Sequence, residues 1–439
     1  AHRASLHEPE SRDARIADLE RAADSIEAQR ESLGPLRWRL SFDAFHRQTL
    51  EDLLVARLER GDPVDELLLL NERLHDVTRR ADPEGSTRRR AEMPDRVATI
   101  AYAVLGDRLL GWMVQRGTPS LVEIDVARST LERAARIAGD PTRPAWRSER
   151  ARMQLFDWLL APFSAELDDL DAVAVTPDGP LGRVPFGLLV DRETGAAAHD
   201  RWLVALTLSP RSMKTPQPAA LAASVDVPRL LAVGDPAFSK THYPTLRRLP
   251  GATHEATAVA RSYPIHEVLI GDRAGRDALL TALDAADRFH YAGHAIVVPD
   301  VPERTRLVLA ESASNEPSDL DVGTIRALPL DRLELAVLSG CETAIGSRRD
   351  GRGTSSLAGA FLHAGVDSVI ATWTPLDDAA SAAFFAQLHA RLAAGEPPAH
   401  AVAMLQRTYL RAQRPTDPMP WVGIHVVTAT WSSLAAGPS

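Results

Sequence analysis

Short apolar segments alternate with longer helical segments through the second half of the chain, and this alternation restricts the fold more than any other feature. Apolar runs of strand length with no polar face are typical of strands buried on both sides, and their alternation with helices favours a mostly parallel sheet covered on both faces. The apolar runs lie at residues 171–179, 229–238, 287–295, 306–312, 333–341 and 366–373, and the helical segments at 251–263, 275–286, 354–365 and 377–395. The sequence therefore predicts an α/β unit.

The N-terminal part shows mainly helical spacing, from about residue 14 to residue 150. Segments 41–61 and 65–81 place apolar residues three or four positions apart around a Gly-Asp-Pro break, which predicts a helix pair. Residues 97–117 share the periodicity, although their large apolar side chains would also suit buried strands. We expect lead-in helices here, and the strand alternative stays open.

Length and composition set further bounds. A chain of 439 residues is longer than one hydrophobic core usually serves, so we expect two or three compact units. No segment approaches the roughly 18 consecutive apolar residues of a membrane span, and the first residues do not resemble a secretory signal. The net charge of -9 argues against a nucleic-acid surface spread over the protein, and a single cysteine fits a reducing compartment. We expect a cytoplasmic protein with no membrane contact and no direct nucleic-acid partner.

Two residues that carry chemistry follow apolar runs directly. His294 follows the run that ends in "HYAGHA", and Cys341, the one cysteine, follows "LELAVLSGC". Ligands of open α/β sheets bind at the carboxyl ends of the strands, so both side chains would be offered at one edge if these strands are parallel. Taken alone, Cys341 suits a packed core thiol and His294 a loop histidine bonded to a carbonyl. Their joint occurrence between small neighbours favours a thiolate nucleophile and its base.

Other chemistries find less support in the sequence. No G-x-S-x-G elbow is present, and "GSRRDGRGTSS" lacks the lysine of a phosphate-binding loop. Zinc is poorly served, because the histidines show no ligand spacing beyond His290 and His294. His290 lies inside the predicted strand and suits a packed role. We therefore expect neither a metal nor another cofactor.

The chain resembles the CHAT-domain proteins, the bacterial branch of caspase-like and separase-like cysteine peptidases, which usually follow tetratricopeptide repeats. The resemblance runs from about Val97 to the C-terminus, and the matching segments, in order, are "AVTPDGPLGRVPFGLLVD", "LLAVGDPAF", "LPGATHEATAVA", "HYAGHA", "LAVLSGCETA", "GTSSLAGAFLHAGVDSVIATWTPLDD" and "DPMPWVGIHVV". It implies a caspase-like, mostly parallel sheet in two lobes. We expect a helical region at 1–96, a remnant of a repeat array; lead-in helices and a noncatalytic lobe at 97–227; and a catalytic lobe at 228–439.

The resemblance also implies roles for particular residues. His294 falls on the family's catalytic histidine and Cys341 on its nucleophile, 47 residues later (341 minus 294), close to the roughly fifty found in caspases. The backbone N–H groups of Ala295 and Cys341 would bind the oxyanion. Caspases have a glycine at the position of Ala295, and a glycine can take a positive φ, which an alanine rarely does. Asp377 would hold a basic P1 side chain, as in separase, or cap the following helix; both roles stay open, and Asp378 could fill either.

The implied function is a cysteine endopeptidase that uses a Cys/His dyad to cut a specific protein substrate, after a basic residue if Asp377 lines the pocket. Relatives in bacterial immunity are held inactive until a partner or signal repositions the site, so we expect control by a regulatory partner protein or an upstream sensor domain. A catalytically silent scaffold that binds partners is the alternative. A nucleotide-binding regulator that uses Gly234 and Gly293 is a third hypothesis, weakened by the absence of a G-x-G-x-x-G motif or P-loop.

Overall fold

The computed structural model describes residues 9–32, 36–75, 93–209, 213, 227–298, 301–311, 318–340, 343, 356–374 and 378–434. Within these residues, eleven strands form one sheet in the order β3-β2-β1-β4-β5-β14-β13-β12-β8-β6-β7. Neighbouring strands are parallel except at β1–β2, β2–β3 and β13–β14. The strands are β1 (Val97–Leu105), β2 (Arg108–Gln115), β3 (Thr118–Asp125), β4 (Ala172–Thr176), β5 (Leu203–Leu206), β6 (Arg229–Pro236), β7 (Ile265–Gly271), β8 (Arg288–Ala292), β12 (Leu335–Leu338), β13 (Ser368–Thr372) and β14 (Ile424–Thr428).

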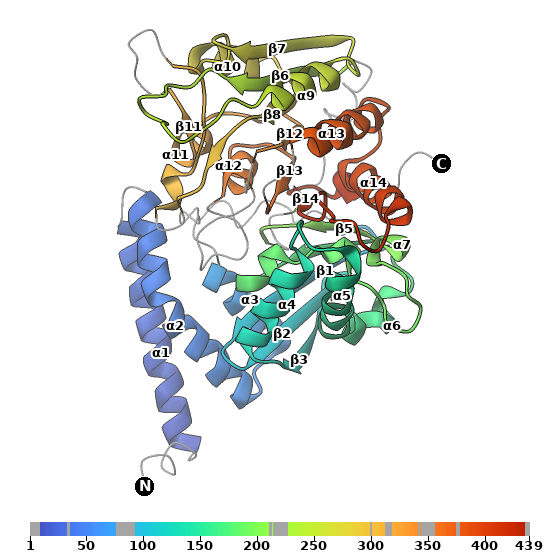
Figure 1. The fold of residues 1–439 in the computed structure, drawn as a ribbon. Helices are drawn as coiled ribbons and strands as arrows, with labels where there is room; N and C mark the ends of the chain where they lie inside the picture. The colour runs from blue at the N-terminus through green and yellow to red at the C-terminus, as the bar shows by residue number, and fades with distance from the viewer. Residues whose placement is uncertain are drawn as a thin grey trace.

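Helices cover both faces of this sheet (Figure 1). One face carries α4 (Arg128–Ala138), α5 (Ala145–Leu159), α10 (Arg276–Leu283), α11 (Val322–Arg326) and α12 (Leu357–His363). The other face carries α9 (Pro250–Ala260), α13 (Asp378–Ala393) and α14 (Pro398–Ala412) over its central strands, and α1 (Pro9–Ser32), α2 (Leu36–Arg60) and α3 (Val64–His75) beside β1 and β2. Two single-turn helices, α6 (Ser164–Leu167) and α7 (Ala198–Arg201), lie in the connections. The predicted mostly parallel α/β sheet with an N-terminal helical region is confirmed.

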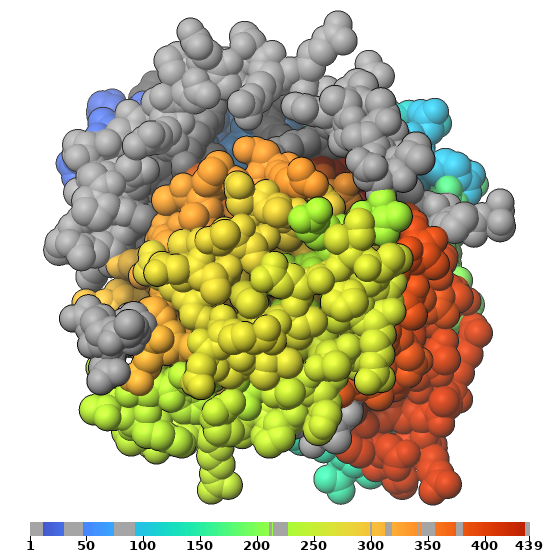
Figure 2. All heavy atoms as spheres, turned by 90° about the horizontal axis from the view of Figure 1, so that it is seen from above, coloured from blue at the N-terminus to red at the C-terminus, as the bar shows by residue number. Residues whose placement is uncertain are grey.

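The sheet runs through both predicted lobes without a break. Strands β1 to β5 form one half, and β6, β7, β8, β12, β13 and β14 form the other. The two halves join where β5 pairs with β14 in parallel at Leu206 and Val427. Seen from above, the segment that contains β6, β7 and β8 lies beside the C-terminal helices on one surface (Figure 2). The domain limits at residues 96 and 227 stay predictions.

Of the two alternatives for the segment that starts at residue 97, the strand alternative is the one observed, because residues 97–125 form the strands β1, β2 and β3 and the first helix after them is α4. Every residue of β1 is buried, since helices cover both of its sides, and an apolar run of this kind carries no period that separates helix from strand. The turn between β2 and β3 has positive φ at both Arg116 (50°) and Gly117 (82°). This is the signature of a tight two-residue hairpin turn.

The apolar run at 306–312 also differs from expectation. Only Arg306–Leu307 is a strand (β10), and it pairs with β9 (Ala295–Ile296) and β11 (Leu320–Asp321) in a separate small sheet. This small sheet begins directly after His294 and fixes the chain there.

Candidate active site

His294 stands two residues beyond the end of β8, at the carboxyl edge of the sheet. It is half-buried, and its ring meets that of Phe238 edge to face, with ring centres 5.5 Å apart. Its backbone is held from two sides, because the N–H of Val308 and the hydroxyl of the buried Tyr291 both lie within hydrogen-bond distance of the His294 carbonyl oxygen, at 2.9 and 2.8 Å. The backbone position of the imidazole is therefore fixed by the fold.

A backbone carbonyl orients the imidazole of His294. The Nε2 atom lies 2.6 Å from the carbonyl oxygen of Arg247, and since a carbonyl only accepts, Nε2 carries the proton. Nδ1 is then the basic nitrogen of the neutral ring. The sequence does not reveal this partner of the imidazole. Every residue has a backbone carbonyl oxygen, so no residue type identifies the one that bonds to His294.

A charged clamp holds the segment that supplies this carbonyl. The carboxylate of the buried Asp235, at the end of β6, accepts from Arg248 Nε at 3.0 Å and from the backbone N–H of Leu249 at 2.9 Å. Asp235 has φ 43°, an uncommon value for a residue with a side chain. Arg248 also donates to the Asp235 carbonyl oxygen at 3.0 Å, so the strand end and the 247–249 segment are locked together.

The segments that follow β8 and β12 approach closely because each contains a glycine, Gly293 and Gly340, where they meet. A Cβ atom on Gly340 would lie 3.1 Å from the carbonyl oxygen of Gly293 and 3.4 Å from the Cβ of Ala295. The two strands pair in parallel up to Leu338 and Tyr291, so both chains leave the sheet at the same edge. The residue before Cys341 thus contacts the residues on either side of His294.

Cys341 itself lies outside the described residues, but the chain on both sides of it is well anchored. Before it, the Gly340 carbonyl accepts from Thr372 Oγ1 at 2.6 Å. After it, Thr343 Oγ1 lies 3.2 Å from the Leu338 carbonyl oxygen and accepts from the Thr372 backbone N–H at 3.1 Å, while the Thr343 carbonyl accepts from Ala358 of α12 at 3.3 Å. Gly340 and Thr343 are therefore both tied to Thr372 of β13.

Ala295 is the first residue of β9, and the pairing register predicts the direction of its N–H. His294 and Val308 are opposite each other and hydrogen-bonded, so the next pair, Ala295 and Leu307, is a non-hydrogen-bonded pair. The N–H of Ala295 consequently points away from β10. Among the described residues, positive φ without glycine occurs only at Arg116 and Asp235, so Ala295 adopts an ordinary backbone and does not need the conformation reserved for glycine.

Asp377 lies outside the described residues, as does the side chain of Asp378, and helix α13 begins at Asp378. The flanks are described: Trp373 donates from its backbone to the Gly423 carbonyl at 2.9 Å, and Ser381 Oγ donates to Glu255 Oε2 at 2.8 Å. The segment that contains Asp377 therefore runs from the end of β13 to a helix that is bonded to α9.

His290 is fully buried in β8, as expected of a packed residue. Its Nε2 lies 3.0 Å from Glu255 Oε1 and its Nδ1 lies 3.1 Å from His389 Nε2, and His389 Nδ1 in turn lies 3.0 Å from the hydroxyl of Tyr263. Burial lowers the pKa of His389 well below its ordinary value, with a further lowering from the neighbouring His290. This series of hydrogen-bonded side chains joins α9, β8 and α13. The sequence did not predict it.

Within the described residues, no group of three His, Cys, Asp or Glu side chains is placed to hold a metal ion. No helix in the same part of the chain has the length and apolar character needed to cross a membrane.

The described residues thus form a mostly parallel α/β sheet with His294 and the residues that flank Cys341 at its carboxyl edge. The family model described as "CHAT domain" matches residues 149–429, well over half of the chain. The chain therefore belongs to the CHAT-domain family. A search of curated protein sequences gave no match.

Among solved structures, the chain matches a separase–securin complex and a gingipain. The separase–securin complex of Saccharomyces cerevisiae matches with TM-score 0.50 and 10% identity in one structure, covering 95% of this chain and 37% of the other, and with TM-score 0.48 and 9% identity in a second, covering 95% and 38%. The Arg-specific cysteine proteinase gingipain R of Porphyromonas gingivalis matches with TM-score 0.38 and 11% identity, covering 66% and 69%. These likenesses concern the fold, and the chain spans less than two fifths of the separase chain that it matches.

Proposed function

We propose that the protein is a cysteine endopeptidase in which Cys341 is the nucleophile and His294 its base. The observation that carries this proposal is the contact of Gly340 with Gly293 and Ala295, which brings the chain next to Cys341 against the chain around His294. Membership of the CHAT-domain family adds support.

In the proposed mechanism, Nδ1 of His294 accepts the thiol proton of Cys341, while the Arg247 carbonyl holds the Nε2–H and so keeps this tautomer. The thiolate attacks the scissile carbonyl carbon, and the backbone N–H groups of Ala295 and Cys341 bind the oxyanion. The imidazolium then gives its proton to the leaving amine. Water, activated by the same Nδ1, hydrolyses the acyl-enzyme and restores the thiol.

The proposed substrate is a protein cut after a basic residue, with the Asp377 carboxylate binding the P1 side chain by charge-assisted hydrogen bonds. We also propose that a regulatory partner protein or an upstream sensor domain controls the activity. Control of this kind predicts little turnover by the isolated chain and a large increase when its activator is added.

The test is labelling by an acyloxymethyl ketone probe with Arg at P1, compared with the same probe carrying Asp at P1. Cys341→Ala and His294→Ala should both abolish labelling, whereas His254→Ala, a change to an exposed histidine of α9, should leave it unchanged. Asp377→Asn should remove the preference for Arg over Asp. Labelling that survives Cys341→Ala would overturn the assignment of the nucleophile.

Absence of labelling by either probe, with candidate partners added as well, would favour the alternative of a catalytically silent scaffold. Labelling that appears only when a partner is present would support the proposed control.

A further inference from the structure

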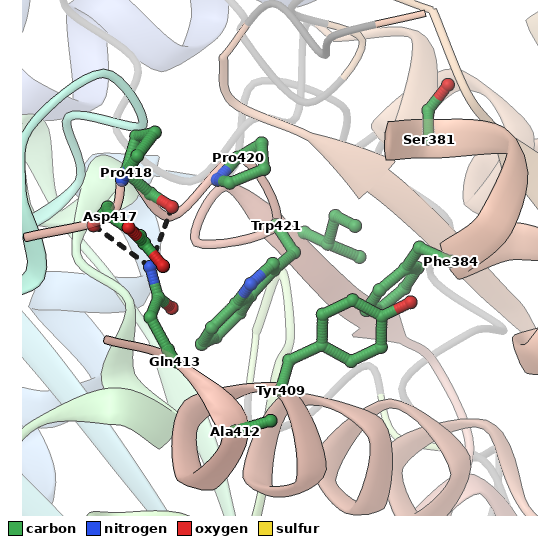
Figure 3. A pocket seen from close by; sticks show the side chains of 10 residues that line it. Ser381, Phe384, Tyr409, Ala412, Gln413, Asp417, Pro418, Pro420 and Trp421 are labelled. Atoms are coloured by element: carbon green, nitrogen blue, oxygen red, sulfur yellow. Dashed lines mark hydrogen bonds between the residues drawn. The ribbon is translucent and has the colours of Figure 1, made fainter. Parts of the chain in front are cut away.

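A pocket of about 270 Å³ lies between α13, α14 and the 417–421 segment (Figure 3). Its walls are aromatic: Phe384 comes from α13, Tyr409 from α14 and Trp421 from the segment that leads into β14. The ring centres of Phe384 and Tyr409 are 5.6 Å apart at 59°, and those of Tyr409 and Trp421 are 6.1 Å apart at 65°. Rings at such distances and angles pack against each other in tilted or edge-to-face arrangements, so the three side chains form one continuous aromatic lining.

Hydrogen-bond acceptors stand at one end of this aromatic pocket. Gln413 Nε2 donates to the backbone carbonyls of Asp417 (3.0 Å) and Pro418 (2.6 Å), which fixes the orientation of its amide. Its Oε1 atom is buried and has no hydrogen-bond partner among the described residues. An acceptor left in this way is costly unless a donor reaches it.

The aromatic pocket is lined by one acidic residue and no basic residue. Asp417 is exposed and lines the pocket, and within the described part of the chain its carboxylate is in no salt bridge. None of the residues that line the pocket is basic. Aromatic faces attract cations, and a carboxylate beside them adds a second attraction. The pocket is thus complementary to a positive group with N–H donors and an apolar stem.

We propose that the aromatic pocket binds an arginine side chain of a partner polypeptide. The guanidinium plane suits the face of the half-buried Tyr409, and its fork of N–H donors suits the carboxylate of the exposed Asp417. The pocket is set in rigid surroundings, because Phe384 and Trp421 are 2% and 5% exposed and Gly423 is packed so tightly against Thr374 that a Cβ there would lie 2.2 Å from Thr374 Oγ1.

The test uses the protein with Cys341→Ala, which cannot cleave the probe in the proposed mechanism. The probe is acetyl-Gly-Arg-Gly-amide, titrated by calorimetry beside its citrulline analogue, which keeps the shape and loses the charge. We expect the arginine peptide to bind at least tenfold more tightly than the citrulline peptide. Equal affinities, or no binding of either peptide at millimolar concentration, would overturn the proposal.

Variants locate the bound side chain. Asp417→Asn and Tyr409→Leu should each weaken arginine binding at least threefold, and Asp417→Asn should also narrow the gap between arginine and citrulline. Asp169→Asn, which removes an exposed carboxylate elsewhere, serves as the matched control and should change nothing. Loss of binding with Asp377→Asn, together with full binding by Asp417→Asn, would place the arginine at the proposed P1 site instead and refute the pocket assignment.

Discussion

Gly293 shows how a single residue can fix the geometry of the candidate site. A Cβ at this position would lie 2.7 Å from the hydroxyl oxygen of Tyr291 and 2.8 Å from its Cζ. Tyr291 cannot move aside, because it is fully buried and its hydroxyl lies 2.8 and 2.7 Å from the carbonyl oxygens of His294 and Val308. Any side chain at position 293 must therefore shift the backbone that carries His294.

We expect Gly293→Ala to lower the rate of probe labelling by about 100-fold, the cost of misplacing a catalytic group by about 1 Å. The measurement is the second-order labelling rate with the Arg probe, with circular dichroism to show that the fold persists. Gly275→Ala is the control, because a Cβ there meets no atom within 4 Å and the backbone φ is -83°. An unchanged rate in Gly293→Ala would mean that this turn does not position His294.

At the scale of elements, the end of β13 holds Gly340 and Thr343, the described residues on either side of Cys341. Two groups of Thr372 hold these residues: its hydroxyl donates to the Gly340 carbonyl, and its backbone N–H donates to Thr343 Oγ1. The strand of Thr372, β13, also pairs with β12. Thr372→Val keeps the shape and the strand while it removes the hydroxyl, leaving the Gly340 carbonyl without this donor. Because a lost buried hydrogen bond costs about 1 to 3 kcal/mol, we expect a modest loss of stability and a larger loss of activity.

The test of Thr372→Val is to measure urea unfolding and probe labelling on the same protein. Thr408→Val is the control, since its exposed hydroxyl bonds only to the Met404 carbonyl within α14. Equal labelling rates in the two variants would contradict a role for Thr372 in placing Cys341.

The elements show what the sequence can and cannot predict. Strands β8 and β12, with the two candidate residues at their ends, were predicted because each is a short apolar run that stops at small residues. Strand β1 was left open between helix and strand, since a run that is apolar almost throughout fits both spacings. The role of the Arg247 carbonyl could not be predicted from the sequence either, because Arg247 and His294 are distant in the chain and meet only in the folded protein.

At the scale of the whole molecule, an ion pair ties the N-terminal helices to the first half of the sheet. Arg47 of α2 donates to both carboxylate oxygens of Asp178, at 2.9 and 2.8 Å, and the Asp178 side chain is fully buried. Arg47→Met would leave a buried carboxylate without this partner, so we expect the free energy of unfolding to fall by about 3 to 5 kcal/mol.

Urea unfolding of Arg47→Met measures this loss. Arg21→Met provides the comparison, because Arg21 pairs with Asp18 on the surface and both side chains are 72% exposed. Such a pair contributes about 0 to 1 kcal/mol. If the two variants lost the same stability, the N-terminal helices would not depend on the Asp178 pair for their attachment.

Buried histidines make the stability of the whole molecule depend on pH. Burial lowers the pKa of His199 to about 4 and that of His425 to about 3, and it lowers that of His389 as well. The His199 ring is enclosed, with Nε2 3.1 Å from Gln406 Oε1 and its face against Gly187, where a Cβ would lie 1.9 Å from Nε2. In the unfolded chain these rings titrate near the ordinary value of about 6.5.

The unfolded state therefore binds more protons than the folded state between about pH 6.5 and pH 4, so the free energy of unfolding must fall as the pH is lowered through this range. A shift from 6.5 to about 4 corresponds to about 3 kcal/mol for His199 at the acid end. Urea unfolding between pH 7 and pH 4.5 measures the slope. His199→Gln should flatten it by removing one titrating group, whereas His254→Gln, on the exposed side of α9, should leave it intact. A slope that His199→Gln does not change would show that His199 is already protonated in the folded protein.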